Sequence, residues 1–466
     1  MKKNKIFAGK KIMIMGLGVL GGGSEATKFL AREAEEILVT DLRSKKELSK
    51  PLESLKRFKN IKYILGRHRI SDFSAFGGRK VDLIVKNPAV PNNSPYLEIA
   101  RQAKIKITND LAIFLNNFKG LTIGITGTKG KTTATRLVGA IFKAAGKKSF
   151  MAGNVGISPL YYLGRQHTQA ILEISSWQLE GLEDKSVNIA IITNIFPDHL
   201  DRYRNFRDYI KAKSLILLKQ TSDDVAILNR DNKITRKLGE LARGRRYWFS
   251  SSYFKEENGC FVKNKSIFYR YLGQEKRIFG LKDIKILGQH NLENVLAAAT
   301  VSLATSIKIQ DIRRAIKNFS GVPDRFELTR MWRGVKFIND TTATTPEASI
   351  NAIKVSRELA YKNIFLIAGG ADKKLNYNSW ALTVKKYSVR PFLLEGTATS
   401  KIHQSLGKRG IKTVIFDDLK KCFNQIIGLV ARGDVVLLSP AAASFGMFKN
   451  EFDRGRQFTQ LVKLLK

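Results

Sequence analysis

One segment of the sequence constrains the fold more than any other: an apolar strand that turns through two glycines directly into a helix. The segment reads Ile123-Gly124-Ile125-Thr126-Gly127-Thr128-Lys129-Gly130-Lys131-Thr132-Thr133. Glycines allow backbone N–H groups to approach phosphate oxygens, and the partial positive charge at the start of the helix favours an anion. Lys131 would reach the terminal phosphates of a nucleotide, and the Thr132 hydroxyl would bind magnesium. The segment therefore predicts an ATP-binding loop.

This loop departs from the strict G-x-x-x-x-G-K-[ST] pattern, because Ile125 occupies the position of the first glycine. The alternative interpretation is an ordinary strand–turn–helix junction. A Gly-Lys-Thr sequence immediately before a regular helix favours the functional interpretation. The nucleotide-binding residues expected here are Gly127, Thr128, Lys129, Gly130, Lys131, Thr132 and Thr133.

Length and composition indicate a multidomain protein of the cytoplasm. A chain of 466 residues is too long for one core and predicts two or three domains of about 150 residues each. Residues 1–5 lead directly into a short apolar strand, so we expect no secretory leader, and no apolar run approaches the roughly 18 residues of a membrane span. Cys260 and Cys422 are the only cysteines, which argues against a disulfide framework or a cysteine zinc site and fits a reducing compartment.

The chain is strongly basic, with 81 Lys and Arg against 40 Asp and Glu and a formal net charge of +41. A charge of this size by itself indicates nucleic acid or an anionic surface as a partner. The basic residues are nevertheless scattered along the chain, without an arginine-rich tail, zinc-finger spacing or a basic segment interleaved with aromatics. We therefore predict a solvated cationic surface, with no specific nucleic-acid partner and no membrane contact.

The first hundred residues have the pattern of a doubly wound α/β domain. Residues 11–15 read as a buried strand, followed by a Gly-x-Gly-x-x-Gly turn and a helix over about 24–32. A second strand, 37–40, ends at Asp41, whose side chain is placed to meet a ribose. The pattern is a weak sign of nucleotide binding, and the alternative is a glycine turn that allows close helix–strand packing.

Two further α/β series follow. The predicted fold class is α/β with three consecutive domains: an N-terminal Rossmann-like domain (1–109), a central P-loop ATPase-like domain (110–321) and a C-terminal Rossmann-like domain (322–466). Short, aromatic, alternating segments over 243–280 predict a small antiparallel insertion in the central domain. Ligands are expected in clefts between the domains.

Two groups of polar residues follow buried strands of the central domain. Glu173 ends one strand, so its carboxylate is expected at the carboxyl edge of the sheet, where it could hold magnesium together with Thr132; a capping or ion-pairing glutamate is the alternative. A second strand is followed by Asn194-Ile195-Phe196-Pro197-Asp198-His199-Leu200-Asp201-Arg202. Two acids, a histidine and an arginine within five residues suit a magnesium-phosphate site, although a single histidine such as His199 is more often structural.

The combination of these motifs resembles the Mur ligase family of cytoplasmic peptidoglycan synthesis. The resemblance continues to the end of the chain in three segments, Gly288-Gln289-His290-Asn291-Leu292-Glu293-Asn294, Asp324-Arg325-Phe326-Glu327 and Ser439-Pro440-Ala441-Ala442-Ala443-Ser444-Phe445. Each motif alone is weak, but together and in this order they are highly specific. The resemblance implies an ADP-forming ligase, active as a monomer, that uses ATP and two magnesium ions.

Within the family, the first domain resembles the uridine nucleotide site of members that act on UDP-N-acetylmuramoyl-L-alanine and glutamate. The resemblance implies catalytic roles for Lys131, His199 and Lys213. It implies metal ligation by Thr132, Glu173, His199 and Lys213, with Lys213 as a carbamate. It implies nucleotide contacts by Asn291, Asn294, Arg325 and Asp340. It implies substrate contacts by Gly18, Asp41, Arg43, Asn154, Thr344, Lys373, Ser444 and Phe445.

A carbamate forms from a neutral amine, so Lys213 would need burial or neighbouring cations to lower its pKa. The alternative is that Lys213 is one more solvated lysine on an amphipathic helix.

Three departures from the family pattern lie near the expected amino-acid pocket: Thr342 stands where a lysine is usual, Gly446 replaces an aspartate, and Glu451-Phe452 reverses the common order. These departures leave D- and L-glutamate open as the added amino acid.

Two rival functions remain at this stage. One is a different amino-acid or folate ligase on the same fold, against which the uridine-type first domain argues. The other is a basic nucleotide-binding or RNA-binding module without enzymatic activity, which would need neither Glu173 nor the Asp198-His199 pair.

Overall fold

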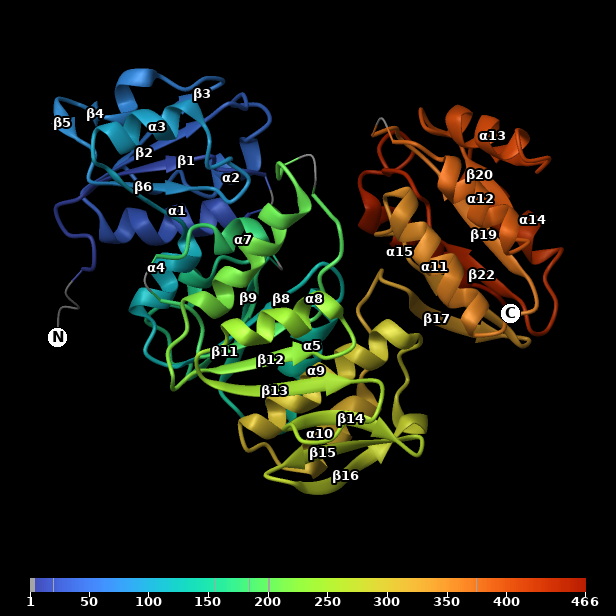
Figure 1. The fold of residues 1–466 in the computed structure, drawn as a ribbon. Coiled ribbons are helices and arrows are strands. Elements are labelled where there is room, and N and C mark those ends of the chain that lie inside the picture. The colour runs from blue at the N-terminus through green and yellow to red at the C-terminus, as the bar shows by residue number, and fades with distance from the viewer. Residues whose placement is uncertain (1–4, 20, 155, 184, 200–201, 374) are drawn as a thin grey trace. The chain divides into compact units, whose positions relative to one another are not determined.

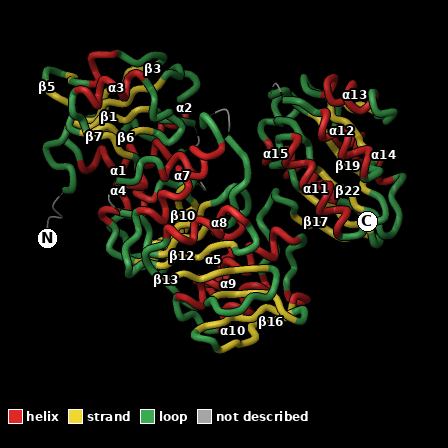
Figure 2. Tube along the Cα trace, in the orientation of Figure 1, coloured by secondary structure: helices red, strands yellow, loops and turns green. Residues whose placement is uncertain are grey.

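Strand and helix alternate throughout the computed structural model, which describes residues 5–19, 21–154, 156–183, 185–199, 202–373 and 375–466 (Figures 1 and 2). The chain forms two units. One contains residues 1–283 and 293–317, and the other contains residues 284–292 and 318–466. Each unit is built around parallel sheets covered by helices, which confirms the predicted α/β fold class.

The first sheet is five-stranded and parallel, in the order β3-β2-β1-β6-β7. Its strands are β1 (Lys11–Met15), β2 (Glu36–Asp41), β3 (Ile61–Leu65), β6 (Leu83–Lys86) and β7 (Lys106–Thr108). Its helices are α1 (Gly22–Glu33), α2 (Ser49–Glu53), α3 (Pro95–Gln102) and α4 (Asp110–Asn117), and a hairpin joins β4 (Ala75–Phe76) to β5 (Arg79–Lys80). All five residues of β1 are buried, as expected for a parallel strand covered on both faces.

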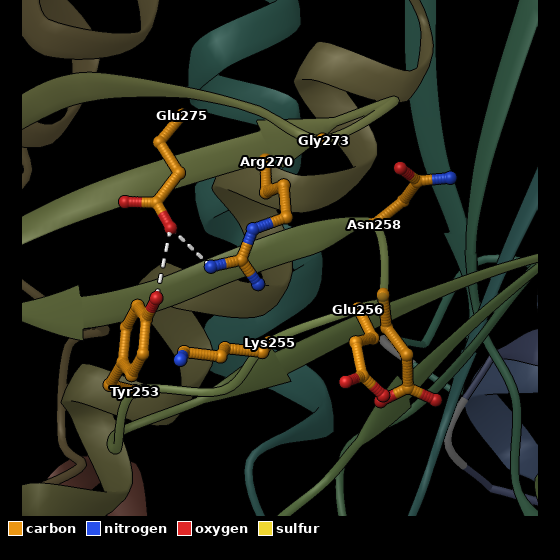
Figure 3. A pocket seen from close by; sticks show the side chains of 8 residues that line it. Tyr253, Lys255, Glu256, Asn258, Arg270, Gly273 and Glu275 are labelled. Carbon is orange, nitrogen blue, oxygen red and sulfur yellow. Dashed lines mark hydrogen bonds and ion pairs between the residues drawn. The ribbon is translucent and has the colours of Figure 1, made fainter.

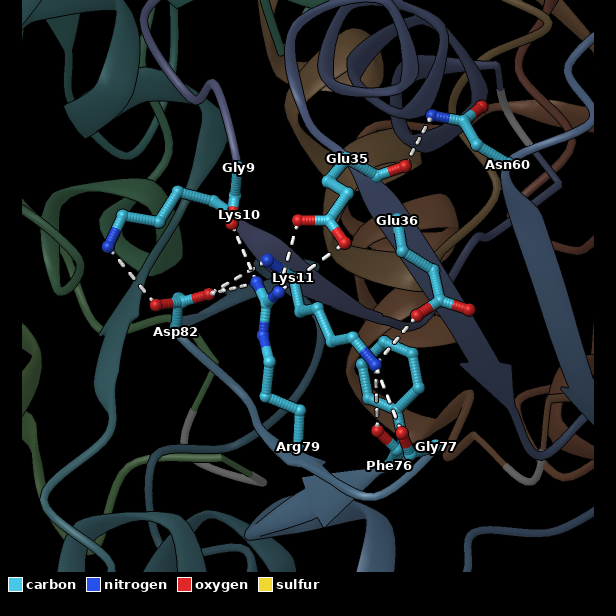
Figure 4. A network of polar contacts seen from close by, with 10 residues as sticks. All are labelled: Gly9, Lys10, Lys11, Glu35, Glu36, Asn60, Phe76, Gly77, Arg79 and Asp82. Carbon is cyan, nitrogen blue, oxygen red and sulfur yellow. Dashed lines mark hydrogen bonds and ion pairs between the residues drawn. The ribbon is translucent and has the colours of Figure 1, made fainter.

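A network of charges braces the amino end of this sheet (Figure 4). Lys11, at the start of β1, is 7% exposed, and its ammonium lies 2.9 Å from the Glu36 carboxylate. The same ammonium donates to the carbonyl oxygens of Phe76 and Gly77. Lys62 pairs with the other oxygen of Glu36. These charges therefore stabilise the amino edge of the sheet. The opposite edge, formed by the carboxyl ends of the strands, is the one at which α/β proteins bind ligands.

The second sheet has nine strands in the order β16-β15-β14-β13-β12-β11-β8-β10-β9. They are β8 (Leu121–Thr126), β9 (Ser149–Gly153), β10 (Gln169–Glu173), β11 (Ile189–Ile192), β12 (Val225–Asn229), β13 (Arg245–Ser250), β14 (Gly259–Lys263), β15 (Ser266–Tyr271) and β16 (Gln274–Gly280). The helices in this part are α5 (Lys131–Ala144), α6 (Ser176–Leu179), α7 (Phe206–Leu218), α8 (Lys233–Leu238), α9 (Gln289–Ala304) and α10 (Ile309–Asn318). One apolar core joins this sheet to the first, with Leu30, Phe114 and Leu172 among its fully buried members.

Residues 243–280, which were expected to form a small antiparallel insertion, add strands to this sheet. β13 pairs in parallel with β12, and β14 in parallel with β13. Only β14, β15 and β16 pair antiparallel, at the edge of the sheet.

The second unit contains a six-stranded sheet in the order β17-β18-β22-β19-β20-β21. Its strands are β17 (Glu327–Trp332), β18 (Val335–Asn339), β19 (Ile364–Gly369), β20 (Arg390–Leu394), β21 (Val414–Phe416) and β22 (Val435–Leu438). Its helices are α11 (Pro346–Glu358), α12 (Asn378–Lys386), α13 (Thr399–Gly407), α14 (Leu419–Ile427) and α15 (Glu451–Lys463). Alternate residues of each strand enter two cores: Leu366 and Leu437 pack with α11, α12 and α13, whereas Phe365 and Val436 pack with α14 and α15. Among the described helices, none has both the length and the apolar character needed to cross a bilayer.

Candidate active site

The glycine loop between β8 and α5 has the geometry of an anion cradle. Gly127 has φ +147° and Gly130 has φ +86°, conformations that residues with a Cβ rarely adopt. A Cβ on Gly127 would lie 1.9 Å from Thr193 Oγ1, and one on Gly130 would lie 2.3 Å from Asn294 Oδ1. Both glycines are therefore required by the backbone and by close neighbours. α5 begins at Lys131, so its free N–H groups lie at the loop.

The side chain of Lys131 folds back over this loop. Its ammonium donates to the carbonyl oxygens of Gly127 at 3.0 Å and Thr128 at 3.1 Å. Thr132 and Thr133 follow in the first turn of α5 and are half-buried. Lys129 is exposed and its ammonium lies 3.9 Å from Asp198. This arrangement places cations and hydroxyls around the mouth of the loop.

The segment after β11 is hydrogen-bonded to the glycine loop. The Asn194 backbone carbonyl accepts from Thr128 N–H, and the Asn194 side chain accepts from Lys129 N–H, both at 2.9 Å. Thr193 Oγ1 donates to the Lys129 carbonyl at 2.6 Å. The Tyr209 hydroxyl on α7 lies 3.0 Å from Thr128 Oγ1. Sequence reasoning missed the bracing role of Tyr209, because its contact joins residues 81 positions apart.

Lys213 lies behind the same loop and is only 2% exposed. Its Nζ donates to the Gly127 carbonyl at 2.9 Å and lies 3.5 Å from Thr126 Oγ1. Burial, and then the nearby Lys131 ammonium, hold the pKa of Lys213 well below 10.5, with Asp198 acting in the opposite direction. The structure thus supplies the burial and the neighbouring cation that a neutral lysine amine requires.

Glu173 ends β10 beside the loop and is 2% exposed. One carboxylate oxygen accepts from Asn154 Nδ2 at 2.8 Å. The other, Oε2, is buried and has no hydrogen-bond partner in the described part of the chain. A buried carboxylate oxygen without a protein partner is costly, and it is the kind of donor that a divalent cation satisfies.

His199 is exposed and adopts φ +53°. Its ring packs against Trp177, with centroids 5.2 Å apart. The neighbouring positions 200 and 201, which the sequence motif includes, lie outside the described residues. The described side chains contain no group of three or more His, Cys, Asp or Glu that could hold a metal.

A cavity of about 550 Å³ lies at the carboxyl edge of the first sheet. Gly18, Asp41, Arg43 and Asn154, predicted to contact substrate, all line it. Asp41 is 2% exposed. One of its carboxylate oxygens accepts from Leu17 N–H at 2.9 Å and Gly18 N–H at 3.2 Å, and the other accepts from Arg43 N–H at 2.9 Å. Because the glycine-turn amides already bind this carboxylate, they are not free to hold the phosphates of a dinucleotide.

A second hollow, of about 280 Å³, lies at β14–β16 (Figure 3). In its lining, Glu275 accepts from the Tyr253 hydroxyl and from Arg270. No residue from the glycine loop lines it. We therefore assign the candidate active site to the glycine loop and the larger cavity.

Two asparagines of α9 were predicted to contact the nucleotide. Asn294 is 2% exposed and lies against Gly130 of the glycine loop. Asn291 is 8% exposed and donates to the Leu287 carbonyl at 2.7 Å. Glu293 lies between these two asparagines in the sequence. Burial, and then the Asp231 carboxylate, raise the pKa of Glu293 to about 7, although Glu293 accepts a hydrogen bond from Asn229 at 3.0 Å. Sequence reasoning did not single out Glu293.

The second unit brings together the residues predicted from the C-terminal motifs. Asp340 accepts from Phe326 N–H at 3.1 Å and Ser439 Oγ at 2.9 Å, and burial raises its pKa to about 7 in spite of these bonds. Arg325, next to Phe326, is exposed. Lys373 donates to Thr344 Oγ1 at 3.0 Å.

Ser444 and Phe445 follow in the C-terminal loop. The Ser444 hydroxyl is buried and has no hydrogen-bond partner among the described residues, and Phe445 is 64% exposed. Thr342, which replaces the usual lysine, donates its hydroxyl to the Asp324 carbonyl at 2.9 Å. The substitution therefore exchanges a charge for a local loop contact.

Arg454 on α15 holds these loops together and is fully buried. Its guanidinium donates to Thr341 Oγ1 at 3.0 Å, to the Thr341 carbonyl at 2.9 Å and to the Ala442 carbonyl at 3.4 Å. Burial lowers the pKa of Arg454 to about 10. Sequence reasoning did not identify this bridge between two loops.

We expect Arg454→Lys to destabilise the second unit by about 1–3 kcal/mol, because a lysine carries its donors on one nitrogen and cannot match the separate guanidinium nitrogens that bind Thr341 and Ala442, so a buried carbonyl loses its donor. The matched control is Arg456→Lys, since Arg456 is 62% exposed and pairs with Asp453 at 3.2 Å. Urea unfolding curves measure both changes. Equal unfolding midpoints for the two variants would contradict the bridging role.

Family models match two parts of the chain: the Mur ligase middle domain matches residues 125–302, and the Mur ligase glutamate ligase domain matches residues 324–442. The chain is 38% identical over 470 residues to the UDP-N-acetylmuramoylalanine--D-glutamate ligase of Roseiflexus sp. (strain RS-1), covering 98% of this chain and 99% of the relative. It is 34% identical over 463 residues to the enzyme of the same name from Alkaliphilus metalliredigens, covering 98% of each.

Solved structures share the fold. MurF from Acinetobacter baumannii aligns with a TM-score of 0.60 at 16% identity, covering 97% of this chain and 93% of that one. The UDP-N-acetylmuramate-alanine ligase of Thermotoga maritima aligns with a TM-score of 0.57 at 20% identity, covering 97% and 99%.

Proposed function

Because the chain belongs to the Mur ligase family, we propose that it joins D-glutamate to UDP-N-acetylmuramoyl-L-alanine while converting ATP to ADP and phosphate. The D-glutamate ligases similar to this chain match it over nearly its whole length. The observation that carries the proposal is the glycine loop, with the Lys131 ammonium over it and the buried Glu173 and Lys213 beside it. This grouping suits phosphoryl transfer to a carboxylate.

A carboxylate is a poor electrophile, so the alanine carboxylate must be activated before an amine can attack it. The alanine carboxylate oxygen attacks the γ-phosphorus of ATP, the bond to ADP breaks, and an acyl phosphate forms. The amine of glutamate then attacks the acyl carbon, loses a proton, and expels phosphate as the amide forms. Lys131 and the N–H groups of the loop hold the charge that develops on the transferred phosphoryl group.

Magnesium fits this site, because Glu173 Oε2 is a buried anionic oxygen without a protein partner in the described chain. Bound magnesium would neutralise phosphate charge and orient the γ-phosphate. We propose Thr132 and Glu173 as ligands of one ion, and His199 with a carbamate on Lys213 as ligands of a second. The carbamate would add an anionic oxygen donor to this second site.

The remaining assignments belong to the same proposal. The 550 Å³ cavity would receive the UDP-bearing substrate through Gly18, Asp41, Arg43 and Asn154. Asn291, Asn294, Arg325 and Asp340 would contact the nucleotide, and Thr344, Lys373, Ser444 and Phe445 would bind glutamate. We further propose domain boundaries near residues 109 and 321, a monomeric enzyme, and a cytoplasmic location.

Mass spectrometry of the products tests the proposal. The protein is incubated with UDP-N-acetylmuramoyl-L-alanine, ATP, magnesium and either D- or L-glutamate. We expect a glutamate-sized mass gain and ADP release with the D-isomer alone. Product with only L-glutamate would make Thr342 and its neighbours the candidates for specificity, and no product with either isomer would refute the proposed substrates.

A further inference from the structure

Arg202, in the segment between β11 and α7, binds a loop of the first sheet more than a hundred positions away. Its guanidinium donates to the carbonyl oxygens of Ala89 at 2.8 Å, Pro88 at 3.0 Å and Val90 at 3.3 Å. The Arg202 side chain is only 12% exposed. Three carbonyls converge on one guanidinium, which matches its planar set of donors.

Two further contacts fix the orientation of this guanidinium. It lies 4.4 Å from the centroid of the Trp177 ring, and its Nη2 is 3.5 Å from Glu180 Oε2. Stacking on tryptophan and pairing with a carboxylate both hold a guanidinium plane in place. Arg202 therefore ties the loop at 88–90 to helix α6, which carries Trp177.

The loop at 88–90 is a wall of the 550 Å³ cavity, and so is Trp177. Asn87 and Val90 lie against the glycine turn, which also lines the cavity, since a Cβ on Gly16 would be 3.0 Å from Asn87 Cβ and 3.4 Å from Val90 Cγ2. Lys86 supports the same loop by donating to the Val90 carbonyl at 3.0 Å. A shift of this loop would therefore change the width of the cavity directly.

We propose that Arg202 is a positioning residue for the uridine substrate: it clamps the loop at 88–90 and so sets the shape of the cavity that receives the UDP moiety. This inference rests on the proposed function of the cavity. Arg202 makes no described hydrogen bond to the glycine loop, so its effect should fall on the UDP substrate and not on ATP.

The test compares Arg202→Met with the matched control Arg204→Met, because Arg204 lies two positions further on, is 88% exposed and pairs with Asp208 at 2.9 Å. We expect Arg202→Met to raise KM for UDP-N-acetylmuramoyl-L-alanine by about tenfold or more, since displacements on the order of 1 Å in a site cost up to about 100-fold. KM for ATP should stay within about twofold. Arg204→Met should match the wild type in both constants.

Arg202→Lys keeps the charge but carries its N–H donors on one nitrogen, so it cannot reproduce the planar spread of the guanidinium donors. It should show the same split with a smaller rise, and it provides the measurement if the methionine variant does not fold. Equal rises in KM for ATP and the UDP substrate, or a rise no larger than in Arg204→Met, would overturn the proposal. UDP binding measured by calorimetry separates this idea from the proposed reaction. Wild-type protein that binds UDP more tightly than Arg202→Met supports the clamp even if no ligase product forms, whereas equal UDP affinities refute it.

Discussion

Replacing Lys213 by methionine is expected to lower ligase turnover by about 10²–10³-fold, the range found when one electrostatic contact to developing charge is removed. The same change should leave the protein folded and as stable as the wild type or more so. The two results have opposite directions because Lys213 is a buried amine with no carboxylate among its hydrogen-bond partners in the described part of the chain. Such a group is costly for folding and is retained for chemistry.

The stability effect depends on pH in a defined direction. Burial and Lys131 hold the folded-state pKa of Lys213 well below the ordinary 10.5, so the unfolded chain binds this proton at higher pH than the folded chain does. The contribution of Lys213 to wild-type stability therefore becomes less favourable as the pH drops from 10.5 to the folded-state pKa. It recovers as the pH rises again towards 10.5. Lys213→Met lacks this contribution, and its advantage in melting temperature should be greatest at the lower pH.

Lys211→Met is the control, because Lys211 lies on the same helix but is exposed. Melting curves in bicarbonate-free buffer measure stability, and ADP release measures turnover. If Lys213 carries a carbamate, bicarbonate should increase wild-type turnover, and ¹³C-bicarbonate should give a carbamate carbon signal that Lys213→Met lacks. Normal turnover of Lys213→Met, with or without bicarbonate, would remove Lys213 from the mechanism.

The parts of the site that could be predicted are those determined by neighbouring residues. Gly127 and Gly130 could be located because a strand–glycine–helix pattern is local. Glu173 could be placed at the sheet edge because it ends a buried strand, and carboxyl ends of parallel strands share one edge. The α/β fold class was confirmed for the same reason: strand and helix periodicities are visible within short windows.

The parts that could not be predicted depend on docking between distant segments. Whether Lys213 is solvated or buried depends on which face of α7 packs against the glycine loop, and helix periodicity alone does not decide this. The contacts of Arg202 with residues 88–90, and those of Arg454 with Thr341, join positions about 110 apart. That Asp41 meets a ribose stays a prediction, and only the folded loop reveals that its carboxylate also binds the amides of its own glycine turn.

Glu173→Gln should lower turnover by about 10²–10³-fold, since it removes a charge that is directed at the phosphoryl group through magnesium. The change is nearly isosteric, and Asn154 Nδ2 can still donate to the remaining carbonyl oxygen of the amide. The buried Oε2, which has no hydrogen-bond partner in the described chain, becomes an amide nitrogen that cannot bind a cation. Folding should therefore be preserved while metal binding is weakened.

A magnesium titration separates this mechanism from a structural one. If Glu173 is a ligand, the half-saturating magnesium concentration should rise by about tenfold or more in Glu173→Gln, and excess magnesium should recover part of the turnover. Glu183→Gln is the control, because Glu183 pairs with Lys106 on the first sheet and should show wild-type magnesium dependence. Reduced turnover in Glu173→Gln with an unchanged magnesium requirement would mean that Glu173 acts by holding Asn154, and that the metal is bound elsewhere.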